Sequence, residues 1–165
     1  MQLEVHISWA DSGMAYIVLR IKGTVNVPHW ARYTLDSLNL YKRFWATIIP
    51  ETRESLGMLR KIKDFVAWTS VDSGFIKELL ERRGKTIGSR PFKGLPDKGS
   101  YHNIEELASD IAKDKVRLSN VQEVKPWFAL NPPRGGFKRK TKTQFHQKGI
   151  LGEDSELADI IKRMM

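Results

Sequence analysis

The chain has 165 residues, enough for one domain or one domain with an elaboration, and its 41% apolar content excludes wholesale disorder. It contains no cysteine, which excludes disulfides, thiol nucleophiles and cysteine-based metal sites. The formal net charge is +9, and seven positive charges lie between Val124 and Gly152, a segment without Asp or Glu, which leaves +2 for the rest. A nearly neutral body with one strongly basic segment is typical of a polyanion binder. The alternative is a solvated tail that promotes solubility.

The sequence gives no signal for a membrane-spanning or secreted protein. The longest apolar run, FWATII at 44–49, is far shorter than the roughly 20 residues that span a bilayer. The first residues, MQLEVHISWADSG, lack the basic and apolar regions of a secretory signal. We therefore expect a cytoplasmic protein.

Residues 15–71 predict a core domain of the α+β class. AYIVLRIK at 15–22 alternates and predicts a half-buried strand, followed by a helix that starts at Pro28. RFWATIIP predicts a second strand, ETRESLGMLRKIK a second helix and FVAWTS a third strand. The order β-α-β-α-β predicts that both helices cover one face of the sheet. The residues expected at that sheet–helix interface are Leu19, Ile21, Leu35, Leu38, Leu59 and Ile62.

Residues 72–165 predict a C-terminal extension of helices separated by irregular segments. DSGFIKELLERRG predicts a helix capped by Asp72 or Ser73, and Asn103 with Glu106 predicts a capping box for IEELASDIAKD. Residues 85–101 are expected to be a loop, and KPWFAL predicts one short strand. Asp154 opens a last helix. NPPRGGFKRKTKTQFHQKG, residues 131–149, predicts an irregular basic segment, named here the basic arm.

Signatures of catalysis are poor. The four histidines are scattered without metal-ligand spacing, and GLPDKGS at 94–100 has Ser100 where a phosphate-binding loop needs Lys. Glu105 and Glu106 are adjacent on a helix, and acids in a first turn are explained by the helix dipole. We expect no enzyme activity, no metal, no cofactor and no small-molecule substrate.

The basic arm has the composition of an RNA-binding segment. Phe137 and Phe145 interleave with cations, and aromatic faces stack on bases while cations neutralise phosphates. The alternative is that the two phenylalanines attach the arm to its own domain. A second basic group on the core could widen one polyanion-binding surface, although such charges usually only solvate a helix face.

At this point the chain resembles a known family. YIVLRIKGTVNV, IIPETRESLGMLRKIKDFVAWTSVD and LNPPRGGFK, in this order, are similar to the large-subunit ribosomal protein L-thirty family, whose eukaryotic counterpart is L-seven. The length and residues 85–165 resemble the archaeal form. The resemblance covers residues 15–165. It implies a ferredoxin-like, three-stranded antiparallel sheet with two helices on one face, and a structural role in binding large-subunit ribosomal RNA beside neighbouring ribosomal proteins.

The resemblance also implies RNA-contacting residues. On the core these are Lys22, Arg32, Lys42, Arg43, Arg53, Arg60 and Lys61. In the basic arm the match to PPRGGFK implies Arg134, Gly135, Gly136 and Lys138, and composition adds Phe137, Arg139, Lys140, Lys142 and Lys148. Residues 1–14 are expected to be an N-terminal extension, because family members start just before the first strand; an upstream start-codon assignment would explain residues 1–13.

Two other functions are open at this stage. One is an RNA-binding maturation or regulatory module outside the ribosome. The other is an RNA-modifying enzyme, which requires a pocket with converging acid, base or metal groups.

Overall fold

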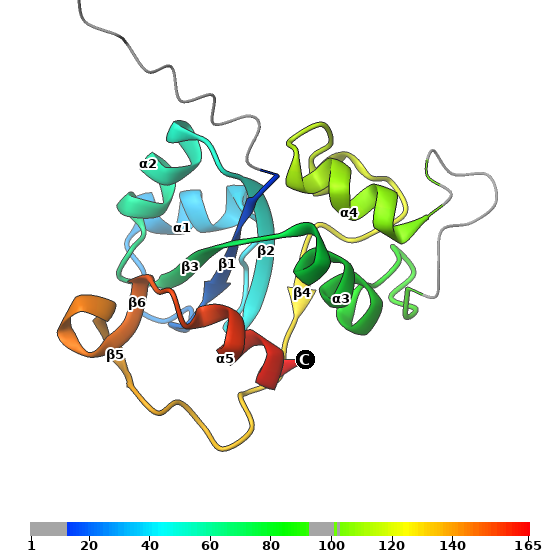
Figure 1. The fold of residues 1–165 in the computed structure, drawn as a ribbon. Coiled ribbons are helices and arrows are strands. Elements are labelled where there is room, and N and C mark those ends of the chain that lie inside the picture. The colour runs from blue at the N-terminus through cyan, green and yellow to red at the C-terminus, as the bar shows by residue number, and fades with distance from the viewer. Residues whose placement is uncertain (1–12, 93–100, 102) are drawn as a thin grey trace, which may run out of the picture.

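The computed structural model describes residues 13–92, 101 and 103–165 (Figure 1). The expectation about the start of the chain therefore lies outside the described residues, apart from Gly13 and Met14. So does the segment 94–100 that was compared with a phosphate-binding loop.

The centre of the fold is the antiparallel sheet that the sequence predicts. β1 (Ala15–Arg20) lies between β2 (Trp45–Pro50) and β3 (Val66–Val71) and pairs antiparallel with both. Helix α1 (His29–Ser37) connects β1 to β2, and α2 (Arg53–Lys61) connects β2 to β3. The predicted β-α-β-α-β order is confirmed.

The sheet is wider than expected, so the predicted three-stranded sheet is wrong. Its six strands have the order β4-β2-β1-β3-β6-β5. β4 (Phe128–Ala129) pairs antiparallel with β2, while β6 (Gly149–Glu153) pairs parallel with β3 and β5 (Lys140–Gln144) parallel with β6. The basic arm is therefore not irregular throughout. The sequence shows no strand pattern for β5 because β5 is polar on both faces. Such a strand is held by its partner strand rather than by a buried side.

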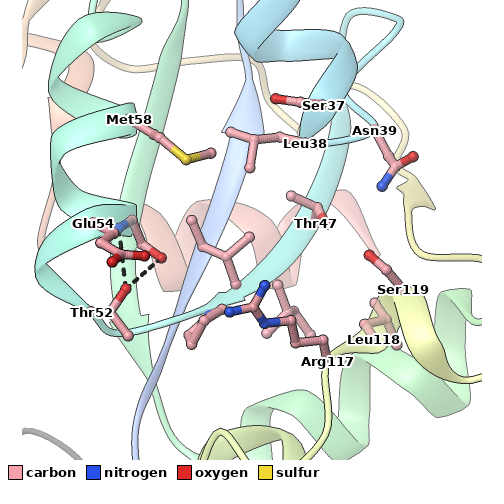
Figure 2. A pocket seen from close by; sticks show the side chains of 14 residues that line it. Ser37, Leu38, Asn39, Thr47, Thr52, Glu54, Met58, Arg117, Leu118 and Ser119 are labelled. Carbon is pink, nitrogen blue, oxygen red and sulfur yellow. Dashed lines mark hydrogen bonds between the residues drawn. The ribbon is translucent and has the colours of Figure 1, made fainter.

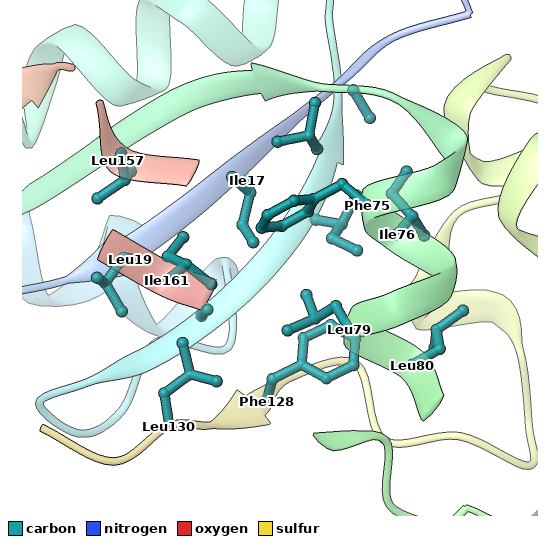
Figure 3. Packing of buried hydrophobic residues seen from close by; sticks show 14 of the residues in the cluster. Ile17, Leu19, Phe75, Ile76, Leu79, Leu80, Phe128, Leu130, Leu157 and Ile161 are labelled. Atoms are coloured by element: carbon teal, nitrogen blue, oxygen red, sulfur yellow. The ribbon is translucent and has the colours of Figure 1, made fainter. Parts of the chain in front are cut away.

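Both faces of the sheet are buried, which corrects two further expectations. Val18 of β1 packs with Leu35 and Leu59 under α1 and α2. Leu19 and Ile21 point to the opposite face, where they join the C-terminal helices (Figure 3), so their predicted place beside α1 and α2 is wrong. β1 is buried along its whole length rather than half-buried, because the extension covers its second face. The other four predicted interface residues, Leu35, Leu38, Leu59 and Ile62, are confirmed.

Within its described residues, the extension supplies three helices and two short 3₁₀ turns. They are α3 (Ser73–Arg83), α4 (Ile104–Ala112), η2 (Leu118–Asn120), η3 (Phe145–Gln147) and α5 (Leu157–Met164). The α3 residues Ile76, Leu79 and Leu80 and the α5 residues Leu157 and Ile161 meet in one buried cluster with Leu19 of the sheet. None of the helices in the described ranges is long and apolar enough to cross a bilayer.

The helix caps follow the sequence in part. The side chain of Asp72 accepts a hydrogen bond from the Phe75 N–H at 3.0 Å, as expected for an N-cap. Asn103 precedes α4 but makes no side-chain capping bond, so the capping box is not formed. The first-turn acid Glu105 instead pairs with Lys77 of α3. An ion pair between α3 and α4 therefore lies at the start of α4, where the capping box was expected.

Candidate nucleic-acid interface

One end of the sheet gathers segments that are far apart in the sequence. Arg20 at the end of β1 pairs with Val66 at the start of β3, and Trp45 at the start of β2 pairs with Ala129 at the end of β4. β5 and β6 run parallel to β3, so both also begin at this end. We name it the basic end; it consists of residues 20–28, 39–45, 62–66, 130–140 and 145–149.

A buried arginine holds two of the loops at the basic end together. Arg20 is 3% exposed, and its guanidinium donates to the carbonyl oxygens of Lys22 at 3.0 Å, Gly23 at 2.8 Å and Leu40 at 2.6 Å. Burial lowers the pKa of Arg20, while the charge of Asp36 acts in the opposite direction. Because Arg20 is fixed by backbone carbonyls, the loops after β1 and α1 are joined without a buried carboxylate.

Three of the core cations expected at the interface lie on these loops. Arg43 is exposed, its Nε donates to the Ile21 carbonyl at 2.9 Å, and its guanidinium carbon lies 4.6 Å from the centre of the Phe44 ring. Lys22 lies over the Phe65 ring at 5.6 Å, and Lys42 over the Trp45 ring at 5.9 Å. Aromatic faces thus orient all three cations.

The basic arm crosses the basic end from β4 to β5 (Figure 1, the orange segment below the sheet). A turn at Gly135 and Gly136, with φ of 78° and 71°, closes with a hydrogen bond of 2.9 Å from the Gly136 N–H to the Pro133 carbonyl. Glycine populates this left-handed region without a steric cost. After the turn, Phe137 packs against Phe44 beside Arg43, with 5.9 Å between ring centres. Phe137 therefore attaches the arm to the domain.

The second half of the arm is built on close backbone contact. A Cβ added at Gly149 would lie 1.9 Å from the Thr143 carbonyl oxygen, so only glycine fits between β5 and β6. Lys148 has a φ of 61° at the end of η3 and is exposed, as are Lys140 and Lys142. β5 therefore presents two exposed lysines at the edge of the sheet, and the turn that leads into β6 presents a third.

Arg139 differs from the other cations of the arm. Its guanidinium pairs with Glu156 at 2.8 Å and lies 4.7 Å from the centre of the Phe145 ring. Phe145 thus contacts a residue of its own arm, and this contact does not attach the arm to the domain. Beside this pair, burial raises the pKa of Asp154, although the Glu156 N–H and Arg139 both favour its charged form.

The structure brings many, but not all, of the predicted residues together. Arg134, Gly135, Gly136 and Lys138 are exposed on the crossing segment, which the Phe44–Phe137 contact joins to the core next to Arg43. Lys61 is exposed in the last turn of α2 and Arg32 on α1, whereas Arg60 shares a pocket with Arg53 and Tyr16 and so lies toward the other end of the sheet. Arg53 starts α2 at the opposite end of β2 and shares a pocket with Met14 and Lys113, so it lies apart from the basic end.

Sequence reasoning missed four side chains that the structure places next to this surface. Trp127, Lys125 and Tyr41 cluster with Trp45 at the edge of the sheet, and Trp30 lies edge-on to Phe65. A local signal existed, because KPW and YKRFW combine lysine with tryptophan. Their meeting depends on the pairing of β2 with β4, which the sequence does not display.

The pocket at the end of α1 does not resemble an active site. This pocket of about 200 Å³ lies between the end of α1, the start of α2 and η2 (Figure 2), and hydroxyl, amide and apolar groups line it, with Glu54 and Arg117 at its sides. Across the described part of the chain, no group of three or more His, Asp or Glu residues could hold a metal ion.

The comparisons with known proteins give the family. The family model for ribosomal protein L30p/L7e matches residues 16–66. A protein of Cenarchaeum symbiosum named large ribosomal subunit protein uL30 is 46% identical over 155 residues, which cover 92% of this chain and 98% of that protein. This chain belongs to the uL30 family. Proteins of the same name from Nitrosopumilus maritimus and Staphylothermus marinus are 41% and 39% identical, over 92% and 91% of this chain and 98% of each relative. The family resemblance inferred from the sequence is confirmed.

Proposed function

We propose that this uL30 family member is a structural component of the large ribosomal subunit and binds large-subunit ribosomal RNA through its basic end. The observation that carries the proposal is the crossing of the sheet end by the basic arm. The Phe44–Phe137 contact joins the arm, at the residue before Lys138, to the core, at the residue after Arg43. The printed names of the relatives supply the assembly, a large ribosomal subunit.

The electrostatics of the basic end support a phosphate-rich partner. Within the described residues, Lys22, Lys42, Arg43, Lys138 and Lys140 take part in none of the four ion pairs found. A cation without a carboxylate partner remains available to phosphate, and each phosphate contact releases counterions and adds to the salt dependence of binding. In this proposal neighbouring ribosomal proteins are further partners, and no catalytic step or cofactor is involved.

The alternative is a maturation or regulatory module that binds the same RNA only transiently. Co-sedimentation separates the two, since a structural component remains with large subunits through a high-salt wash and a transient factor does not. The proposal further places the protein in the cytoplasm with the assembled subunits.

Charge neutralisation at the basic end tests the RNA-binding surface. Replacing Lys138, Lys140 and Lys142 with Gln should weaken binding to large-subunit RNA. If all three lysines meet phosphates, the slope of log affinity against log salt should become shallower by about two to three. Unchanged affinity and slope, with the fold preserved, would return the basic arm to the status of a solubility segment.

A matched control removes the same charge elsewhere. Lys113, Lys115 and Arg117 are exposed after α4; Lys113 lies beside Arg53, and Arg117 lines the pocket that includes Pro50 at the end of β2. Their replacement by Gln should leave the slope unchanged. An equal loss in both triple variants would show that only net charge, and no defined surface, attracts the RNA.

A further inference from the structure

Two tryptophans form a stack at the edge of the sheet. Trp45, the first residue of β2, and Trp127, just before β4, have ring centres 3.9 Å apart and planes inclined by only 10°. Lys42 lies over the Trp45 ring at 5.9 Å, and Lys125 over the Trp127 ring at 4.9 Å. Tyr41 meets Trp45 edge-on at 6.1 Å. The cluster thus contains two parallel indoles, each with a lysine ammonium over its ring.

The cluster lies at the border of the core, where Trp45 packs against buried residues while the cluster stays partly open to solvent. Both indoles are only partly buried, and Tyr41 is 46% exposed. Neither lysine belongs to any ion pair among the described residues. The Nζ of Lys125 also donates to the Ser89 hydroxyl at 2.8 Å, an exposed contact that a phosphate can replace at little cost.

Attachment of β4 does not require the indole stack. Phe128 is fully buried in the core, its backbone pairs with Ala46, and the Thr47 hydroxyl donates to the Pro126 carbonyl at 2.9 Å. These contacts already fix the strand on both sides of Trp127. The two indoles, and the lysine ammonium groups that lie over them without an ion pair among the described residues, are therefore available for recognition.

We infer that the Trp45–Trp127 stack is a binding site for an unpaired RNA base, with Lys42 and Lys125 meeting the phosphates on either side of that nucleotide. The inference rests on the proposed function and deepens it. Every nucleobase has a π face, so stacking on indole is tolerant of sequence, and flanking ammonium groups match the flanking phosphates. An acidic protein segment would satisfy the lysines but would leave the aromatic faces unused, so the observations favour RNA.

The stack is continuous with the basic end. Trp45 lies two residues after Arg43, and Trp127 precedes β4, from which the basic arm departs. An RNA strand that follows the arm would therefore pass the edge of β4. There a splayed base would take the place of the Lys125 ammonium on the outer face of Trp127, and Lys125 would move to the flanking phosphate.

Binding of transcribed large-subunit RNA to Trp127→Leu and Trp127→Phe variants over a salt series tests the inference. Leucine keeps apolar bulk but has no π face, so affinity should fall roughly tenfold to a hundredfold while the salt slope stays that of the wild type. Phenylalanine should retain affinity within about threefold. Lys125→Gln should instead make the slope shallower by about one.

A second readout does not depend on the fold of the leucine variant. A base stacked on indole quenches its fluorescence, so wild-type emission should drop when large-subunit RNA is added and Trp127→Phe should lose part of that drop. Equal quenching in both proteins, or wild-type affinity in a folded Trp127→Leu, overturns the stacking site while the proposed function stands. Failure of the wild type to bind the RNA overturns both. Poor incorporation of Trp127→Leu into subunits with unchanged RNA affinity would assign the stack to a protein neighbour and also overturn it.

Discussion

The ring of Phe137 rests on the ring of Phe44, with 5.9 Å between their centres and planes inclined by 33°. Phe44 in turn donates its backbone N–H to the Arg20 carbonyl at 2.8 Å. The guanidinium carbon of Arg43 lies over the Phe44 ring, 4.6 Å from its centre. One aromatic contact thus connects the basic arm, the loop before β2 and the end of β1. The charges of the arm and of the core are held in a fixed relation by it.

Phe137→Ala should detach the middle of the basic arm without changing any charge. Because the side chain is partly buried, we expect a modest loss of about 1–3 kcal/mol in the free energy of unfolding, below the cost of a fully buried phenylalanine. Amide exchange at Gly136 should become faster, and RNA affinity should fall. The stability, amide exchange and RNA affinity of Phe137→Leu should lie between those of the wild type and of Phe137→Ala. Wild-type exchange and affinity in the alanine variant would show that the turn at Gly135 and Gly136 holds the arm by itself.

Leu59→Ala should cost roughly 2–5 kcal/mol in unfolding free energy, because Leu59 is fully buried between α2 and the sheet. Met58, its neighbour on the same helix, is 37% exposed and provides the control. Denaturant unfolding of Met58→Ala should differ from the wild type by less than about 1 kcal/mol. Similar losses of stability in both variants would mean that α2 turns a different side toward the sheet.

Gly149→Ala should separate β5 from β6. The new methyl group would overlap the Thr143 carbonyl oxygen, which is backbone and cannot rotate away. Gly57 in α2 offers a control, since a Cβ added there meets nothing within 4 Å. Gly57→Ala should stabilise the protein by about 0.5–1 kcal/mol, because alanine favours a helix over glycine. Thermal unfolding measures both, and a stable, wild-type-like Gly149→Ala would contradict the pairing of these strands.

Asp154→Asn should change how stability depends on pH. Burial raises the pKa of Asp154, so the folded state holds this proton more tightly than the unfolded state. The stabilising effect of the proton is full below the unfolded pKa of about 3.9 and is lost as the pH rises through the raised folded value. At neutral pH the asparagine variant should therefore be at least as stable as the wild type, and this advantage should vanish in acid.

Asp154→Ala serves as the comparison for that experiment. The Oδ1 atom of Asp154 accepts the Glu156 N–H at 2.8 Å, and asparagine keeps this acceptor whereas alanine removes it. Relative to Asp154→Asn, the alanine variant should be less stable by about 1 kcal/mol at every pH, because neither variant titrates at this position. A neutral-pH loss in Asp154→Asn as large as in the alanine variant would show that the charge itself is needed, through Arg139.

Local periodicity was enough to predict the centre of the fold. The spacing of Leu35, Leu38, Leu59 and Ile62 placed two helices over a sheet, and all four residues are buried there. The same reasoning misplaced Leu19 and Ile21. Successive side chains of a strand point to opposite faces of the sheet, and the sequence does not say which of the two faces meets α1 and α2.

Pairing between distant segments accounts for the remaining differences. β5 has the sequence KTKTQ, which no buried face selects, and it forms only because β6 lies beside it. The Trp45–Trp127 stack likewise needs the register that joins β2 to β4. Composition therefore located the charges of the candidate interface, whereas tertiary contacts decided which aromatic side chains accompany them.

The parallel pairing of β3 with β6 has a consequence for the order of folding. Ala67 opposes Gly152, so this ladder closes only after α3, α4, β4 and the basic arm have been synthesised. Contacts of such large sequence separation pay a loop-closure cost before they contribute any stability, and they form late. We therefore expect β1, β2 and β3 to fold with α1 and α2 while the nascent chain is still growing. The basic end is completed last, when the C-terminal strand reaches the edge of β3.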